Sequence, residues 1–103
     1  MPITSKQRAQ LRGLAMNEDT IILVGKTGIT ENLIESVSAA LKARELVKGK
    51  VQENCMLSAR EACEALAETC RAEPVQVIGT KFVLYKRNEQ EPKIVLVKDN
   101  KKK

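Results

Sequence analysis

A chain of 103 residues holds one domain, and an aromatic content of 2% predicts a core of aliphatic side chains. The formal net charge of +5 favours a polyanionic partner, and the absence of histidine removes the side chain that most often serves in acid–base catalysis and metal binding. No apolar run is long enough to cross a bilayer, and the first residues lack the apolar region of a signal peptide. We therefore expect a cytoplasmic protein that acts away from membranes.

The N-terminal part of the chain predicts a helix and then a strand. Thr4 and Gln7 have the spacing of a capping box, which favours a helix over residues 5–16. The continuous apolar run at residues 21–24 predicts a strand that is buried on both faces. The apolar stripe of the helix comprises Leu11, Leu14 and Ala15.

A second helix and a second strand follow. Thr30 is a favourable N-cap for a helix over residues 31–44, and Ile29 and Ile34 have the spacing of a hydrophobic staple. Residues 46–51 then alternate in character, which predicts a strand with one face turned to the core. Its expected inward residues are Val47, Gly49 and Val51, and its expected outward residues are Lys48 and Lys50.

A third helix carries two of the three cysteines. Ser58 and Glu61 form a second capping box that opens a helix to about Arg71, and Pro74 is expected to stop it. Cys63 and Cys70 lie seven residues apart on one helical face, so we expect them in the core rather than in redox chemistry. Three cysteines are too few for a four-thiolate zinc site, and an odd number argues against a disulfide framework.

Two further strands, at residues 75–78 and 82–85, are joined through a short turn and form a hairpin. The resulting order of elements predicts a layered α/β (α+β) domain in which helices cover a mixed four-stranded sheet. Right-handed crossovers favour three parallel strands, and the hairpin adds an antiparallel fourth. We expect the domain to span residues 1–87 and a polar, basic tail to span residues 88–103, with a candidate edge strand at residues 94–97.

Gly25, Lys26, Thr27 and Gly28 lie between the first strand and the second helix. A P-loop would need a glycine five positions before Gly25, where this chain has Thr20. A different phosphate-binding mode fits better, because two glycines let backbone amides approach an anion, Lys26 adds positive charge, and the following helix N-terminus favours a phosphate. The alternative is a tight turn between strand and helix with no binding role.

Basic residues elsewhere extend this candidate site. They lie side by side on the first helix, at the end of the second helix and on the outward positions of the second strand. The candidates are Arg8, Arg12, Lys42, Arg44, Lys48 and Lys50. Each alone is typical of a solvated surface charge, whereas the two strand lysines would gather on one face. For base stacking the candidates are Phe82, which we expect in the core, and Tyr85.

Four stretches of the chain occur in the order and at the spacing of one family. They are TSKQR through LR at residues 4–12, VGKTGIT at 24–30, AL with ELVK at 40–48, and VQVIG with VLY at 75–85. In these stretches the chain resembles the CRM domain, and more narrowly the stand-alone bacterial YhbY-type proteins, over about residues 3–87.

The resemblance implies a fold similar to the C-terminal domain of translation initiation factor three. It also implies RNA binding centred on the Gly-x-x-Gly loop. Bacterial members of the family are associated with precursors of the large ribosomal subunit, and plant relatives with intron splicing.

These observations predict a non-enzymatic RNA-binding protein that binds ribosomal RNA or large-subunit precursors and assists their assembly. The alternative is a protein-interaction adaptor on ribosomes or assembly factors that uses the acidic third helix, through Glu61, Glu64 and Glu68. An enzyme is disfavoured, because without histidine catalysis would need a carboxylate pair or an activated cysteine, and no spacing here proposes one. No cofactor, metal or small-molecule substrate is expected.

Overall fold

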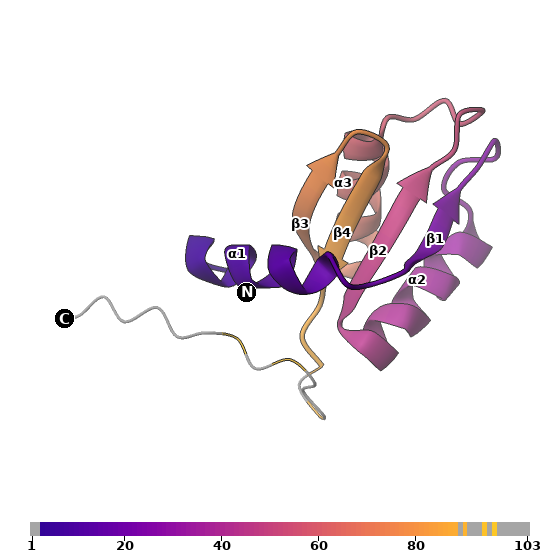
Figure 1. The fold of residues 1–103 in the computed structure, drawn as a ribbon. Helices are drawn as coiled ribbons and strands as arrows, with labels where there is room; N and C mark the ends of the chain where they lie inside the picture. The colour runs from indigo at the N-terminus through magenta and orange to yellow at the C-terminus, as the bar shows by residue number, and fades with distance from the viewer. Residues whose placement is uncertain (1–2, 89, 91–93, 95, 97–103) are drawn as a thin grey trace.

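The computed structural model describes residues 3–88, 90, 94 and 96. Seven elements follow in the predicted order, and each boundary lies within two residues of the prediction (Figure 1). They are α1 Ser5–Ala15, β1 Thr20–Val24, α2 Glu31–Arg44, β2 Leu46–Val51, α3 Ala59–Cys70, β3 Glu73–Ile78 and β4 Lys81–Tyr85. No helix in this part of the chain is both long enough and apolar enough to span a membrane.

The four strands form one mixed sheet in the order β1-β2-β4-β3. β1 and β2 are parallel, and β4 lies between β2 and β3 and is antiparallel to both. The first three strands therefore run in one direction and the fourth runs against them, as the crossover argument predicted. The prediction of an α+β domain with a mixed four-stranded sheet is confirmed.

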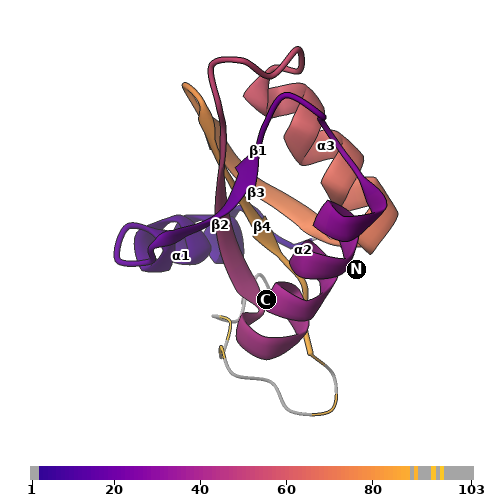
Figure 2. The same ribbon diagram turned by 90° about the vertical axis from the view of Figure 1, so that its right-hand side faces the viewer.

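The two faces of the sheet are covered unequally. α2 and α3 cover one face, and their apolar side chains form the larger core cluster with the inward residues of the strands (Figure 2). α1 crosses the opposite face near one end of the sheet, where Leu11 and Ala15 pack with Leu46, Val83 and Tyr85 (Figure 1). The part of this face beyond α1 is called the open face below. Its outward residues are Ile21, Leu23, Lys48, Lys50, Gln76, Ile78 and Lys81.

The capping residues predicted from the sequence start the helices. The Thr4 hydroxyl accepts a hydrogen bond from the Gln7 backbone N–H at 3.1 Å, and the Gln7 side chain accepts one from the Thr4 N–H at 3.0 Å. Ser58 and Glu61 form the same reciprocal pair at 3.1 and 2.9 Å. Thr30 caps α2. Each cap satisfies backbone donors that the first turn of a helix leaves without partners.

The prediction that β1 is buried on both faces is wrong. Ile22 and Val24 point into the core, but Ile21 is 37% exposed and Leu23 is 53% exposed. β1 is an edge strand, and the cluster beneath α1 includes residues of β2, β3 and β4 but none of β1. The outward side chains of β1 therefore lie on the open face.

Two smaller expectations also need correction. Leu14 was placed in the apolar stripe of the first helix but is 40% exposed, because α1 contacts the sheet through Leu11 and Ala15. α3 ends before Pro74 is reached: Arg71 adopts a left-handed conformation with φ of 59°, which terminates the helix. Pro74 instead lies in β3, an edge strand, where a missing N–H is tolerated.

Glu45 is fully buried between α2 and β2, and its carboxylate binds the chain beyond β4. Its two oxygens accept hydrogen bonds from the backbone N–H groups of Asn88, at 2.6 Å, and Ile94, at 2.7 Å. Ile94 and Leu96 also pack against the cluster beneath α1. Neither of these two residues is in a strand, and residues 95 and 97 of the candidate edge strand lie outside the described residues.

Candidate nucleic-acid interface

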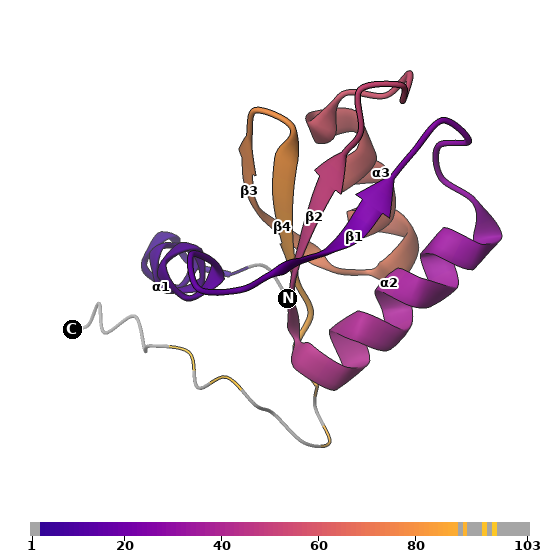
Figure 3. The same ribbon diagram turned by 45° about the vertical axis from the view of Figure 1, so that its right-hand side comes forward.

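The loop between β1 and α2 is a tight turn that exposes its central residues (Figure 3). The Gly28 N–H donates a hydrogen bond to the Gly25 carbonyl at 2.9 Å, which closes the turn. Gly28 has φ of 72°, a left-handed conformation that favours glycine over other residues. Lys26 and Thr27 are exposed at the tip. Within the described residues their backbone N–H groups make no backbone hydrogen bond, so they remain available to an anion.

Gly25 serves a different purpose from Gly28. A Cβ at Gly25 would lie 2.8 Å from the side-chain oxygen of Gln52, so the glycine allows the loop to lie close beside the segment that follows β2. The Gln52 N–H donates to the Val24 carbonyl at 2.9 Å and fixes the two segments side by side. The loop is thus anchored at its base and free at its tip.

The N-terminus of α2 contributes less to anion binding than the sequence suggested. The Thr30 hydroxyl already accepts the Leu33 N–H at 3.1 Å, and Glu31 places a negative charge in the first turn. An acidic side chain there interacts favourably with the helix dipole and competes with a phosphate for it. Among the groups of this loop, the Lys26 side chain and the tip amides are therefore the ones best placed to meet an anion.

Two lysines of the open face lie at the same end of the sheet as the loop. In the sheet register Lys50 is directly opposite Lys81, and both side chains are exposed. Two like charges on facing strand positions repel each other, so this pair gains from a shared anion. Sequence reasoning selected Lys50 but missed Lys81, because the two become neighbours only through the pairing of β2 with β4. We call Lys26, Lys50 and Lys81 the lysine row.

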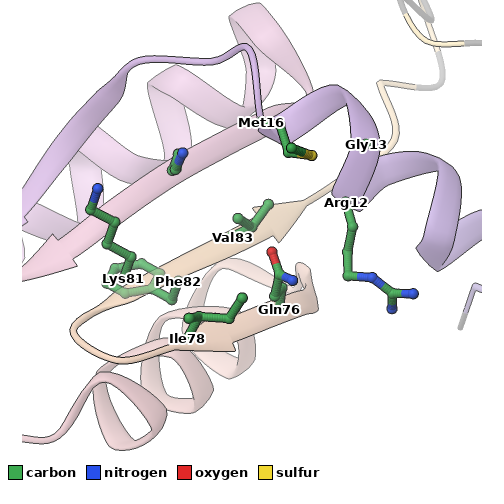
Figure 4. Close-up of a pocket in the computed structure, with 9 residues that line it drawn as sticks. Arg12, Gly13, Met16, Gln76, Ile78, Lys81, Phe82 and Val83 are labelled. Atoms are coloured by element: carbon green, nitrogen blue, oxygen red, sulfur yellow. The ribbon is translucent and has the colours of Figure 1, made fainter.

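A groove of about 400 Å³ lies next to the lysine row, between the C-terminal end of α1 and the open face (Figure 4). Its floor and walls combine apolar and basic side chains, with no acidic residue among them. The groove is lined by Arg12, Gly13, Met16, Lys48, Gln76, Ile78, Lys81, Phe82 and Val83. The Lys48 ammonium donates to the Ala15 carbonyl at 3.4 Å, which holds it at the end of α1.

The structure gathers some of the predicted basic residues and separates others. Arg12 and Lys48 line the groove, and Lys50 lies in the lysine row. Arg8 instead turns to the edge of the sheet, where its guanidinium donates to the Pro74 carbonyl.

Two further candidates, Lys42 and Arg44, are in the last turn of α2, at the opposite end of a helix about 20 Å long from the loop. Arg44 lies 3.9 Å from the Glu18 carboxylate, and Lys42 lines a separate hollow with Lys86 and Arg87. These positions are not part of the surface around the loop.

The two aromatic residues are both in the core, so neither presents a ring for base stacking. Phe82 is buried as predicted, but the choice of Tyr85 as the candidate stacking residue is wrong. Tyr85 lies beneath α1, and within the described residues its hydroxyl has no hydrogen-bond partner. Burial raises the pKa of the Tyr85 hydroxyl, and the nearby Glu45 carboxylate adds to this effect.

The two cysteines of α3 lie in the core, away from this surface, and the third, Cys55, is a partly buried free cysteine in the segment that follows β2. Burial, together with the charge of Glu64, raises the pKa of the Cys63 thiol to about 11, so it stays protonated and unreactive at neutral pH. Cys70 is buried as well, which confirms the prediction for both. The described residues contain no group of three or more cysteine or carboxylate side chains that could hold a metal ion.

The fold and this basic surface define a small α+β domain with an exposed glycine loop, and residues 3–86 match the CRS1/YhbY (CRM) domain. The chain belongs to this family.

Relatives from several organisms align over nearly their full length. The chain is 39% identical over 94 residues to a Bacillus subtilis protein named "Probable RNA-binding protein YqeI", covering 91% of this chain and 98% of that one. It is 33% identical to a Haemophilus influenzae protein named as an RNA-binding protein, covering 85% and 89% of the two chains. It is also 41% identical to SAV1595 of Staphylococcus aureus, whose solution structure superposes with a TM-score of 0.77 over 92% of this chain and 99% of that one.

Proposed function

We propose that this protein binds RNA through the loop at residues 25–28 and the adjoining lysine row. The observation that carries the proposal is the convergence of Lys26, Lys50 and Lys81 at one end of the sheet, beside a glycine turn with exposed amides. Relatives of nearly the same length are named as RNA-binding proteins, which supports the choice of polymer. The interaction needs no catalytic group, because charge and backbone donors alone hold phosphates.

Binding of this kind is governed by salt. Each lysine that neutralises a phosphate releases a condensed counterion, so affinity falls linearly on a log–log plot against salt concentration. For a single strand the slope is about −0.7 per phosphate, and three lysines give about −2. Phosphate contacts carry no sequence information, so discrimination between sequences by these groups alone should be weak.

The test compares wild type with Lys26→Ala in fluorescence anisotropy titrations of a structured ribosomal RNA fragment at several salt concentrations. We expect the variant to bind more weakly and its slope to become shallower by about 0.7 to 0.9, depending on whether the lost contact is to a single-stranded or a paired segment. Lys6→Ala is the matched control, since it removes one exposed lysine on α1, away from the loop, and should bind as the wild type does. Equal affinities and slopes for wild type and Lys26→Ala would refute the role of the loop.

We further propose that the RNA is ribosomal and that the protein assists maturation of the large subunit without catalysing a reaction. The likeness to a family associated with large-subunit precursors supports this role. Tagged protein from a cell lysate should then sediment in a gradient with precursors of the large subunit. Recovery only in the fractions of free protein would contradict the assembly role while leaving RNA binding intact.

A second candidate function is that of a protein adaptor, and it is supported by the placement of the acidic residues on α3. Glu61, Glu64 and Glu68 are exposed on α3, which covers the sheet face opposite the open face. A protein bound there would leave the basic surface accessible. Ribosome association that survives nuclease treatment and is lost on charge reversal at Glu64 and Glu68 would support the adaptor.

A further inference from the structure

The groove between α1 and the open face has a composition that phosphate binding alone does not need. Met16 is 81% exposed and Ile78 is 63% exposed, although each is a large apolar side chain. They face each other across the groove, with Val83 at its base (Figure 4). Exposed apolar side chains that converge on one hollow indicate a ligand with an apolar face.

The polar groups of the groove specify that ligand further. Arg12, Lys48 and Lys81 supply positive charge at its sides, and no acidic side chain lines it. The Gln76 amide projects into the groove, and it makes no hydrogen bond to any other residue that the structure describes (Figure 4). An amide offers one acceptor and two donors, which match the hydrogen-bonding edge of a nucleobase.

We propose that the groove holds one unpaired nucleobase of the bound RNA. The flat faces of the base lie against Met16 and Ile78, its edge bonds to Gln76, and Arg12 and Lys81 hold the flanking phosphates. This proposal rests on the RNA binding proposed above and adds to it a preference for single-stranded over fully paired RNA.

The size of the groove and its continuity with the lysine row favour a nucleotide over a peptide as its ligand. At about 400 Å³ the groove is at the lower end of the roughly 300–1,000 Å³ range of small-ligand sites. A helix of about 10 Å diameter would not enter it. Lys81 belongs both to the groove and to the lysine row, so one RNA strand can contact the row and enter the groove.

The test separates the contribution of the base to the binding affinity from that of the phosphates. Wild-type protein is titrated with a labelled eight-nucleotide RNA and with the same RNA carrying one central abasic site, which keeps the phosphates and lacks the base. An aliphatic platform stacks a base less strongly than an aromatic one, so we expect a preference of about 3- to 10-fold for the intact RNA.

Variants then assign the preference to the groove. Met16→Ser/Ile78→Ser changes two exposed side chains and should fold normally, yet it should bind both RNAs equally. Leu14→Ser is the matched control, because it removes a partly exposed apolar side chain of α1 that does not line the groove, and it should keep the preference. Lys26→Ala should weaken binding of both RNAs and leave their ratio unchanged.

NMR gives an independent readout at the residue itself. Adenosine 5′-monophosphate at millimolar concentration should shift the Gln76 side-chain NH₂ signals, whereas ribose 5-phosphate should not. The proposal that the groove holds a base would be overturned by equal wild-type affinity for the intact and abasic RNAs, or by a preference that survives in the double variant. Either result would leave the proposal of RNA binding by the loop unchanged. Binding of neither RNA would overturn both proposals.

Discussion

Substitution of Gly49 by alanine tests how closely β2 and β4 are packed. The ring of Phe82 lies directly over Gly49, so an added Cβ would come within 2.4, 2.6 and 3.0 Å of three ring atoms. Ordinary van der Waals contact begins at 3.4 Å, so the ring would have to move by about 1 Å. Phe82 is only 1% exposed and is surrounded by the main core cluster, which leaves it no space to move into.

The expected cost follows from two opposing effects. Overpacking of a dense core costs about 1–3 kcal/mol. Alanine in place of glycine restricts the unfolded chain and returns about 0.4–1 kcal/mol where its native conformation is permitted, as it is in this strand. Three ring contacts at or below 3.0 Å put the overpacking in the upper half of its range, at about 2–3 kcal/mol. We therefore expect Gly49→Ala to lower the free energy of unfolding by about 1–2.5 kcal/mol.

Urea denaturation followed by circular dichroism measures this change. With a slope of about 1 kcal/mol per molar urea, the midpoint should fall by about 1–2.5 M. Gly49→Ala/Phe82→Leu supplies the control, because the smaller side chain makes room for the methyl group. The double variant should lose less stability than the two single changes summed. A Gly49→Ala protein within 0.5 kcal/mol of wild type, or strictly additive losses, would refute the close packing.

Three further predictions concern buried polar groups. Glu45→Gln leaves without an acceptor one of the two backbone N–H groups that the carboxylate binds, and it should lower the free energy of unfolding by about 1–3 kcal/mol in urea denaturation. Hydrogen exchange at the Asn88 and Ile94 amides should become faster, and unchanged exchange would contradict the role of the carboxylate. The pKa of the Cys63 thiol is 9.0 in the unfolded chain and about 11 in the folded protein, so its contribution to stability is complete below pH 9 and is lost as the pH rises to 11. In thermal melts, the melting temperature of Cys63→Ala should therefore fall less than that of wild type between pH 9 and 11. Tyr85→Phe removes a buried hydroxyl that has no partner among the described residues, so the melting temperature of the variant should match or exceed that of wild type. A loss of more than about 1 kcal/mol in the free energy of unfolding would show that the hydroxyl is bonded.

The secondary structure was predictable because its signals are local. Capping boxes at Thr4 and Ser58 and the N-cap at Thr30 fix the helix starts through contacts three residues apart. Alternation along residues 46–51 identified the face on which Lys48 and Lys50 lie. The turn at residues 25–28 was found for the same reason, since Gly28 acts on its own backbone, whereas the contact of Gly25 with Gln52 could not be found from the local sequence.

The remaining features depend on contacts between segments distant in sequence. Lys81 joins the candidate site only because β4 pairs with β2, and no pattern near Lys81 indicates that partner. The exposure of Leu23 and the burial of Tyr85 are both set by where α1 crosses the sheet. Aromatic character suggested Tyr85 for stacking, whereas its position under α1 decided the outcome.

The interior position of β4 has a consequence for biosynthesis. β4 is synthesised after the other three strands that the structure describes, yet β2 and β3 each pair with β4 and not with each other. Until Tyr85 has left the ribosome, the nascent chain exposes an unpaired edge of β2 and an unpaired β3. Exposed edges of this kind recruit other strands. Premature termination anywhere before β4 should therefore yield an aggregating fragment rather than a smaller folded domain.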